Sequence, residues 1–183
     1  MTGARTPPPE TPFSVGSDGV AAWSALHAGA WIGLLETHKR LTRELDAELD
    51  AKFGLSLSEL ELLGRLAAAP GRCLRLTSLA AVCGLSLSRV SRLAAGLERR
   101  GLIERRSCDD DGRAVEAHLT APGLELLRDA QEVHFASVKR AFFDHLDDSE
   151  LRTLSTVFAR LAHRSSHTEE RRSSDAGGAA PAT

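Results

Sequence analysis

The stretch LSLSRVSRLAAGLERRGLIER, residues 85–105, starts with an amphipathic helical pattern and ends with the first residues of a strand. Ser86 can cap the helix and Gly101 can end it. On a helical wheel, the face that carries Arg92 and Arg99 lies opposite the apolar face. The apolar face, which we expect to be buried, consists of Val90, Leu93, Ala94 and Leu97. The pattern therefore predicts a helix that packs on a core and presents arginines on its outer face.

A shorter helix precedes this one, and a β-hairpin follows it. Thr77 can cap a short helix that Gly84 ends, so only a tight turn separates the two helices. Residues 102–106 fit one strand and the alternating residues 115–119 fit a second, with a polar Asp-Gly turn between them. Two helices joined by a tight turn and followed by a hairpin predict a winged helix-turn-helix.

A long helical pattern comes before this region. Apolar residues from Trp23 to Leu49 recur at helical spacing, and Ser17 or Asp18 can serve as the N-cap. A helix of about 30 residues is about 45 Å long, which is more than one small core can cover. We therefore expect this helix to pack partly against a second chain.

The other helices also have recognisable starts. Ser56 and Glu59 form a capping box, Thr120 can cap a second long helix, and Asp147 with Glu150 can start a last one. That last helix should bury Leu151, Leu154, Phe158 and Leu161. The fold class is therefore mainly α with a small β-hairpin wing, a winged helix-turn-helix core flanked by long N- and C-terminal dimerisation helices. The expected divisions are a disordered tail at 1–16, a dimerisation helix at 17–53, a winged helix-turn-helix domain at 54–120, C-terminal dimerisation helices at 121–163 and a disordered tail at 164–183.

Charge is distributed unevenly along the chain. The net charge is −2 over 183 residues, but the segment from Arg72 to Arg106 contains eight arginines and two glutamates. That segment carries +6 and the remainder carries −8. A basic island that coincides with the predicted helix-turn-helix is typical of a nucleic-acid-binding surface. For any single arginine, an ordinary solvated surface is the alternative.

The same residues resemble a known family. The stretch 85–105, followed by Asp111-Gly-Arg113, by Leu119-Thr120 and by Gly123, is similar to the recognition helix and wing of the MarR family, the multiple-antibiotic-resistance regulators. The resemblance covers about residues 20–162. It implies a homodimer whose first and last helices interlock and whose recognition helices enter successive major grooves of double-stranded DNA. It also implies that Arg113, oriented by Asp111, reaches into a minor groove; the alternative is a salt bridge within the hairpin.

The expected DNA contacts fall into two groups. Small and basic side chains let a helix approach base edges and phosphates, and the helix N-terminus adds amide donors. On the recognition helix the candidates are Ser86, Ser88, Arg89, Ser91, Arg92 and Arg99, and on the wing they are Arg105, Arg106, Asp111 and Arg113. The side chains of Asp109 and Asp110 at the wing tip should point away from phosphate.

A ligand site is expected from the resemblance, since similar regulators often bind small aromatic or anionic molecules between the dimerisation helices and the winged domain. Aromatic rings together with histidine and arginine suit a planar anion. The candidates are Trp23, His27, Trp31, His38, Arg65 and His134. Ordinary packing in a dimer core is the alternative, and it is favoured for each of these residues taken singly.

The cysteines and histidines predict no metal site and no cofactor. Cys73, Cys83 and Cys108 are odd in number and irregularly spaced, so neither a disulfide framework nor a zinc knuckle is indicated. We expect no close cluster of histidine with cysteine or aspartate apart from the acidic wing tip. A redox-responsive regulator that acts through a cysteine is an alternative. However, the peroxide sensors of this family carry the reactive cysteine on the first helix, partnered by tyrosines, whereas this chain has no tyrosine and no cysteine before residue 73.

Several classes of protein are excluded by what the sequence lacks. It has no apolar run of about 18 residues, no apolar N-terminal stretch of a secretory signal, and no glycine-rich phosphate loop, nucleophile elbow or HExxH motif. We therefore expect a cytoplasmic bacterial protein that is not an enzyme. The predicted function is a sequence-specific DNA-binding transcriptional regulator, a dimeric repressor of nearby genes that a small aromatic or anionic ligand releases from a pseudo-palindromic operator. The alternative, a winged helix used only for protein contacts, would have no salt-dependent affinity for DNA.

Overall fold

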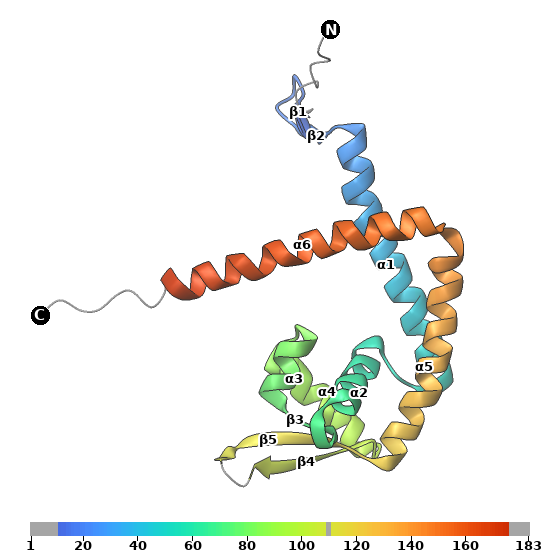
Figure 1. Ribbon diagram of the computed structural model, residues 1–183, viewed down its shortest axis with the longest axis vertical. Coiled ribbons are helices and arrows are strands. Elements are labelled where there is room, and N and C mark those ends of the chain that lie inside the picture. The colour runs from blue at the N-terminus through green and yellow to red at the C-terminus, as the bar shows by residue number, and fades with distance from the viewer. Residues whose placement is uncertain (1–10, 109–110, 176–183) are drawn as a thin grey trace, which may run out of the picture. The chain divides into compact units, whose positions relative to one another are not determined.

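The computed structural model describes residues 11–108 and 111–175, and the chain divides after Ala136 into two compact units. The first unit contains β1 (Phe13–Val15), β2 (Ala21–Trp23), α1 (Ala25–Phe53), α2 (Leu57–Ala68), β3 (Cys73–Arg75), α3 (Leu76–Cys83), α4 (Leu87–Arg99), β4 (Ile103–Cys108), β5 (Asp111–Leu119) and most of α5 (Ala121–Ala141), with a 3-10 turn at Pro70–Arg72 (Figure 1). The second unit contains the end of α5, a 3-10 turn at Phe143–His145 and α6 (Asp148–Asp175). Within the described ranges, no helix is both long and apolar enough to cross a membrane.

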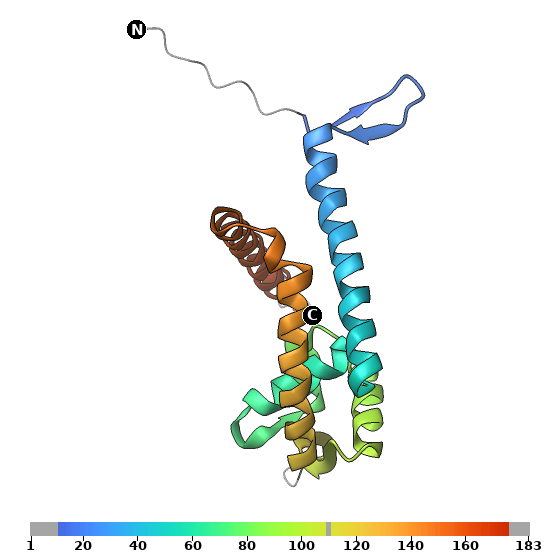
Figure 2. The same cartoon turned by 90° about the vertical axis from the view of Figure 1, so that its right-hand side faces the viewer.

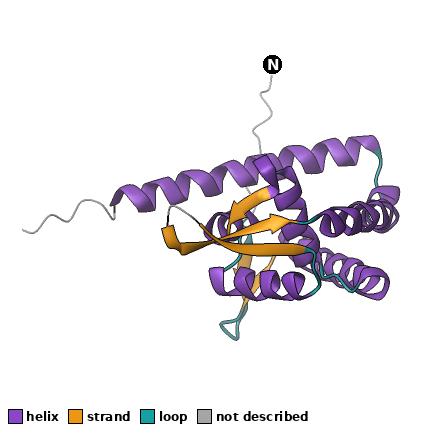
Figure 3. Cartoon of the chain, turned by 90° about the horizontal axis from the view of Figure 1, so that it is seen from below, coloured by secondary structure: helices purple, strands orange, loops and turns teal. Residues whose placement is uncertain are grey.

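The core of the first unit lies where α2, α3 and α4 meet the sheet (Figure 3). Val90, Ala94 and Leu97 of α4 are fully buried, and Leu93 packs against the same core from a half-buried position. This confirms the inner face that the sequence predicts for this helix. Burial of each large aliphatic side chain contributes about 1.5–3 kcal/mol, so α4 is held firmly by one face while its outer face stays exposed.

Two helix starts follow the prediction in detail. The backbone N–H of Glu59 donates to Ser56 Oγ at 3.3 Å, and the backbone N–H of Ser56 donates to Glu59 Oε2 at 2.8 Å, which confirms the capping box of α2. At the start of α4, the backbone N–H of Arg89 donates to Ser86 Oγ at 3.3 Å. Each cap satisfies amide groups that have no partner within the helix itself.

Helix α3 ends where expected but starts earlier. Gly84 adopts the left-handed conformation with φ 62° directly after Cys83, as the turn between two helices requires. The prediction of Thr77 as the N-cap is wrong, because strand β3 runs directly into the helix. Arg75 therefore occupies the capping position, and its side chain makes no capping hydrogen bond.

The strands β3, β5 and β4 form an antiparallel sheet in that order. The β4–β5 hairpin confirms the predicted wing, although both strands are longer than expected and a register irregularity lies between Ser107 and Cys108. The third strand, β3, was not predicted because three residues between a turn and a helix carry no readable alternation. It places Cys73 opposite His118 and Arg75 opposite Glu116.

Helix α5 starts in close contact with Gly101 and Leu102, the two residues between α4 and β4. Thr120 Oγ1 accepts from the backbone N–H of Gly123 at 3.1 Å, which confirms the predicted cap, and donates to the carbonyl oxygen of Gly101 at 2.7 Å. A Cβ atom on Gly123 would collide with the carbonyl oxygen of Leu102. Glycine at this position therefore lets the first turn of α5 lie against the backbone of Leu102, directly before β4.

Gly123→Ala is expected to destabilise the protein by about 1–3 kcal/mol, because backbone atoms must move to accommodate the methyl group. Urea unfolding at fixed protein concentration measures the change. Gly64→Ala is the matched control: its added Cβ would meet only Gln131 Nε2, at 4.0 Å. That helical substitution should be neutral or stabilising by up to about 1 kcal/mol. Equal stability of Gly123→Ala and the wild type would contradict the close approach.

Helix α1 starts later than predicted, after Ser24 rather than after Ser17 or Asp18. The reason is that strands β1 and β2 pair as a hairpin, and Asp18 accepts a hydrogen bond in its turn. Trp23 belongs to this hairpin, which precedes α1 (Figure 2). Its ring meets that of Phe13 edge-on with 6.2 Å between centroids. The predicted disorder of residues 1–16 is therefore wrong for 13–15, whereas residues 1–10 lie outside the described part of the chain.

The N-terminal half of α1 leaves apolar side chains exposed within the first unit. Near its other end Leu49 is only 1% exposed and belongs to the core. The exposed side chains are Leu26, Trp31, Ile32, Leu34 and Leu35. A helix that is packed at one end and apolar but exposed at the other agrees with the expectation that a single small core cannot cover it.

Helix α6 of the second unit starts where the sequence predicts, and it continues beyond residue 163, the predicted end of the C-terminal helices. The backbone N–H of Asp147 donates to Glu150 Oε2 and that of Glu150 donates to Asp147 Oδ1, both at 2.9 Å. The predicted disorder from residue 164 is wrong as far as Asp175, because the Glu and Arg residues there favour helix even though they give no apolar periodicity. In the single chain Phe158 and Leu161 are 45% and 51% exposed. The expectation that α6 buries these two side chains is therefore wrong for the chain taken alone.

Candidate nucleic-acid interface

The outer face of α4 is exposed and basic. Ser86, Ser88, Arg89, Arg92 and Arg99 are all exposed, and Ser91 is half-buried. Among the residues that the structure describes, Arg92 and Arg99 make no hydrogen bond or ion pair. Their guanidinium groups can therefore bind an external acceptor without breaking an internal contact.

The N-terminus of α4 is polar and held in place. Arg89 donates through Nη2 to Ser58 Oγ at 3.2 Å, which connects α4 to α2. The hydroxyl oxygens of Ser86 and Ser88 lie 3.2 Å apart. Backbone amides at a helix start, with small hydroxyl side chains around them, suit a phosphate oxygen.

The arginine that follows this face, Arg100, has a structural contact that the sequence did not predict. It donates through Nη1 to the carbonyl oxygen of Gly54 at 2.7 Å and through Nη2 to that of Phe53 at 2.8 Å. It thus binds the carbonyl end of α1 and ties that helix to α4. Sequence spacing gives no signal for this contact, because 46 residues separate Arg100 from Gly54.

The two arginines of β4 are paired with glutamates. Arg105 donates to Glu98 through its backbone N–H at 3.0 Å and through Nε at 2.8 Å. The side-chain hydrogen bond from Arg105, followed by the backbone one, lowers the pKa of Glu98 below its usual value. Arg106 pairs with Glu104 at 2.5 Å in a more exposed position. Arg105 is therefore engaged in joining α4 to the wing, and its assignment as a DNA contact stays a prediction.

The two remaining wing candidates are Asp111 and Arg113. Their backbone lies in strand β5, but their side chains are outside the part of the chain that the structure describes. The roles expected for them, and the expected direction of Asp109 and Asp110, which are also outside it, stay predictions.

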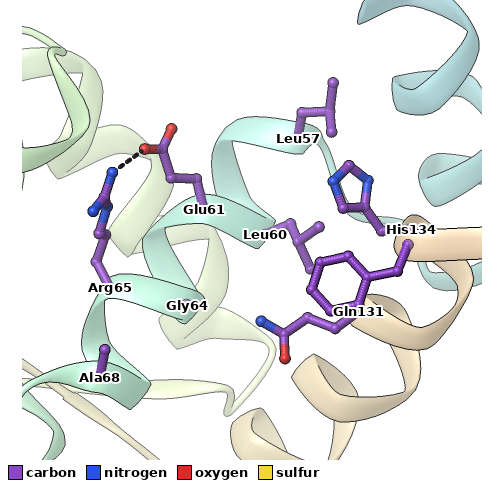
Figure 4. Close-up of a pocket in the computed structure, with 9 residues that line it drawn as sticks. Leu57, Leu60, Glu61, Gly64, Arg65, Ala68, Gln131 and His134 are labelled. Carbon is purple, nitrogen blue, oxygen red and sulfur yellow. Dashed lines mark hydrogen bonds and ion pairs between the residues drawn. The ribbon is translucent and has the colours of Figure 1, made fainter. Parts of the chain in front are cut away.

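A pocket in the first unit lies between α2 and α5 (Figure 4). It brings together two of the six ligand candidates, Arg65 and His134. Arg65 is paired with Glu61 at 3.1 Å, on the opposite wall from His134 and Gln131. The full lining is Leu57, Leu60, Glu61, Gly64, Arg65, Ala68, Gln131, His134 and Phe135.

The other four ligand candidates do not line this pocket. Trp23 belongs to the β1–β2 hairpin, His27 lies 2.7 Å from Ser24 through Nδ1 and Oγ, and Trp31 and His38 are exposed on α1. Sequence reasoning missed the polar lining residues Glu61 and Gln131, because neither follows a pattern that distinguishes a pocket wall from a solvated face.

His134 is the most distinctive side chain of the pocket. Its Nδ1 atom is buried and has no hydrogen-bond partner among the described residues. Burial lowers the pKa of His134, so its imidazole is neutral near pH 7. A buried ring nitrogen without a partner is costly, and a ligand that offers a hydrogen bond would satisfy it.

His134→Gln is expected to reduce the loss of stability on acidification. In the unfolded chain a histidine has a pKa of about 6.5, and burial lowers the pKa of His134 in the folded protein. The unfolded state therefore binds this proton more readily, and stability that is present above about pH 6.5 is lost as the pH falls. Urea unfolding between about pH 7 and pH 5 measures this dependence, with His145→Gln at an exposed position as control. If wild type and His134→Gln show the same dependence on pH, His134 does not titrate in this way.

A second group of side chains meets on the sheet, contrary to the expectation of no close histidine and cysteine cluster. Cys73 Sγ lies 3.4 Å from Glu116 Oε2 and 3.4 Å from His118 Nε2. This cluster could not be predicted from spacing, because Cys73 is 43 residues from Glu116 and 45 residues from His118 in the sequence. Cys83, by contrast, lies elsewhere, and burial raises the pKa of its thiol, as expected for a residue near the core.

Comparison with known proteins agrees with this architecture. Residues 53–114 match the sequence profile of the MarR family. AbsC, a MarR family transcriptional regulator from Streptomyces coelicolor, is 31% identical with a TM-score of 0.72, over 78% of this chain and 96% of AbsC. The chain belongs to the MarR family. It is therefore a transcriptional regulator and not an enzyme, as the sequence predicts.

Two further relatives of this MarR protein are informative. Sco3205, a MarR family transcriptional regulator from Streptomyces coelicolor solved in complex with DNA, is 32% identical with a TM-score of 0.73, over 77% of this chain and 88% of Sco3205. The transcriptional repressor MprA of Escherichia coli (strain K12) is 42% identical over 53 residues. That match spans 29% of this MarR chain and only 30% of the length of MprA.

Proposed function

We propose that this MarR protein is a homodimeric repressor that binds a pseudo-palindromic site in double-stranded DNA, with helix α4 of each protomer in a major groove. The observation that carries the proposal is the outer face of α4, where Arg92 and Arg99 are exposed and have no partner among the described residues. Small neighbours such as Ser88 and Ser91 let the helix approach base edges, and arginine is the side chain best suited to guanine and phosphate. The DNA complex of the relative Sco3205 supports the same interpretation.

The homodimer is supported by apolar side chains that one chain leaves exposed. On α1 these include Trp31 and Leu35, and on α6 they include Phe158 and Leu161. Contiguous exposed apolar side chains on long helices are typical of an interface between protein chains. A dimer would place two copies of α4 side by side, as a site with twofold symmetry requires. A repressor of this kind works beside the chromosome, in the cytoplasm of a bacterial cell.

The proposed test for DNA binding is fluorescence anisotropy with labelled duplex from the region upstream of the protein's own gene. We expect saturable binding that weakens at least about 100-fold between about 50 and 200 mM salt, because phosphate contacts release counterions. A duplex with the same base composition in scrambled order should bind more weakly. No binding at low salt would contradict DNA recognition and favour a winged helix that only contacts proteins.

We further propose that a small aromatic acid releases the repressor from DNA by binding in the pocket between α2 and α5. Support comes from the convergence of apolar side chains with Arg65 and with the unpartnered Nδ1 of His134. A neutral imidazole nitrogen can accept a hydrogen bond from a phenol or carboxylic acid, and Arg65 can attract an anion once it leaves Glu61.

A panel of hydroxybenzoic and phenylalkanoic acids, titrated into the protein–DNA complex, tests this second step. At least one acid should lower the anisotropy, and His134→Phe should weaken its effect about tenfold or more, since a buried hydrogen bond is lost. His145→Phe, exposed and outside the pocket lining, is the matched control. An effective acid that acts equally on the wild type and on His134→Phe would place its site elsewhere.

A further inference from the structure

The three side chains that meet on the sheet belong to one strand face. Strands β3 and β5 are antiparallel with Cys73 directly opposite His118, and Glu116 lies two residues before His118 on the same side of β5. The residue between them, Ala117, is fully buried and faces the core. The three donors therefore lie together on the outer face of the sheet, where Glu116 and His118 are 27% and 28% exposed.

The distances between the donor atoms fit a tetrahedral metal ion. Cys73 Sγ is 3.4 Å from Glu116 Oε2 and 3.4 Å from His118 Nε2, and Glu116 Oε2 is 3.7 Å from His118 Nε2. Zinc bound at its usual distances of about 2.0–2.3 Å, with tetrahedral angles, separates such donors by about 3.3–3.7 Å. All three ligand atoms could thus bind one ion with only small side-chain movements.

The chemistry of the donors indicates which ion. A thiolate, an imidazole and a carboxylate are the three ligand types of zinc sites, and the thiolate disfavours magnesium and calcium. With one thiolate and one carboxylate, the complex with a divalent ion is electrically neutral, which suits a half-buried position. Arg75 Nε lies 3.9 Å from Glu116 Oε1, the oxygen that does not face the cluster, and so leaves Oε2 directed at Cys73 and His118.

We propose that Cys73, Glu116 and His118 bind one zinc ion per chain, with water in the fourth position. The ion displaces the proton of the Cys73 thiol to solvent and joins its sulfur, the Glu116 carboxylate and the His118 Nε2 in one centre. Since β3 continues directly into α3 and β5 returns from the wing, zinc cross-links the helix-turn-helix to the wing. The site is separate from the outer face of α4 and from the pocket, so zinc binding can be measured without DNA or effector.

Cobalt titration of the untagged full-length protein under reducing conditions is the direct test, because tetrahedral thiolate-bound Co²⁺ absorbs strongly in both the visible and near-ultraviolet ranges. We expect one Co²⁺ per chain, a sulfur-to-cobalt charge-transfer band, and displacement of the band by Zn²⁺. Cys73→Ser should abolish this band, whereas Cys83→Ser and Cys108→Ser should retain it.

Two further measurements keep the test independent of any single variant. Glu116→Gln preserves the size of the side chain and should weaken Zn²⁺ binding at least about 100-fold, since removal of even an indirect partner of a ligand costs 10- to 100-fold. Zn²⁺ should raise the melting temperature of the wild type and of Cys83→Ser but not of Cys73→Ser. Absence of the charge-transfer band in the wild type, its persistence in Cys73→Ser, or unchanged Zn²⁺ affinity in Glu116→Gln would each overturn the proposal.

Discussion

Trp31→Asp combined with Leu35→Asp is expected to convert the protein to monomers and to weaken its binding to an operator at least about 1,000-fold. These side chains are 51% and 46% exposed in one chain and lie one helical turn apart on α1. In the proposed dimer they are covered by the partner, so each aspartate would bury an unpaired carboxylate at a cost of several kcal/mol. A monomer contacts only one half-site and loses the second copy of α4. Analytical ultracentrifugation measures the mass, and anisotropy measures the DNA affinity.

The matched control for this variant is Arg40→Asp, which introduces an acidic side chain on the opposite side of the same helix. Arg40 is exposed, and among the described residues it pairs only with Glu44, at 3.1 Å, an exposed contact of small energetic value. It should leave both the dimer and the DNA affinity nearly unchanged. Circular dichroism checks that every variant is folded. A wild type that sediments as a monomer, or a double variant that remains dimeric, would contradict the proposed interface.

Arg92→Ala is expected to weaken operator binding at least about 100-fold and to reduce discrimination against altered base pairs. A bidentate arginine contact with a guanine edge contributes about 1–3 kcal/mol, and a dimer loses two such contacts. The dimer itself should be unaffected, because Arg92 is exposed and makes no hydrogen bond or ion pair with any described residue. Anisotropy titrations on the operator and on single-base variants of it measure both changes.

Two further variants show whether such a loss comes from a base contact, from a phosphate contact or from the loss of any exposed arginine. Arg92→Lys keeps the charge but cannot form the bidentate contact, so it should recover little affinity if Arg92 reads a base and most of it if Arg92 binds a phosphate. Arg128→Ala removes an exposed arginine from α5, outside the outer face of α4, and should change little. Wild-type affinity and specificity in Arg92→Ala would remove α4 from the recognition mechanism.

The parts of the fold that the sequence predicts are those with local signals. The capping box of Ser56 and Glu59, the left-handed Gly84 and the apolar face through Val90 and Leu97 each depend on residues within one or two helical turns. Such contacts can be read from spacing alone. The wing hairpin could be predicted for the same reason, because only a short polar segment of the sequence separates its two strands.

The parts that it does not predict depend on residues far apart in the chain or on segments too short to show a period. Strand β3 has three residues, and its pairing brings Cys73 to His118 across 45 positions. Likewise, Arg100 binds the end of α1 through backbone carbonyls, which no side-chain pattern marks. Of the six ligand candidates, only Arg65 and His134 line the pocket, and they do so without the aromatic residues expected beside them. Trp23 and Trp31 are exposed in the single chain, and helical periodicity does not distinguish such a surface from a pocket wall.

Selection of binding sites from a pool of random DNA duplexes shows whether a dimer reads DNA through two copies of α4, because it assumes no operator in advance. Two copies of α4 related by a twofold axis should enrich a pseudo-palindrome whose half-sites are centred about 10 base pairs apart, one helical turn of DNA. Selection with Arg92→Ala should yield a weaker or altered half-site at the same spacing. Failure of the wild type to enrich any sequence, or enrichment of a single site without twofold symmetry, would contradict a dimer that reads DNA through α4.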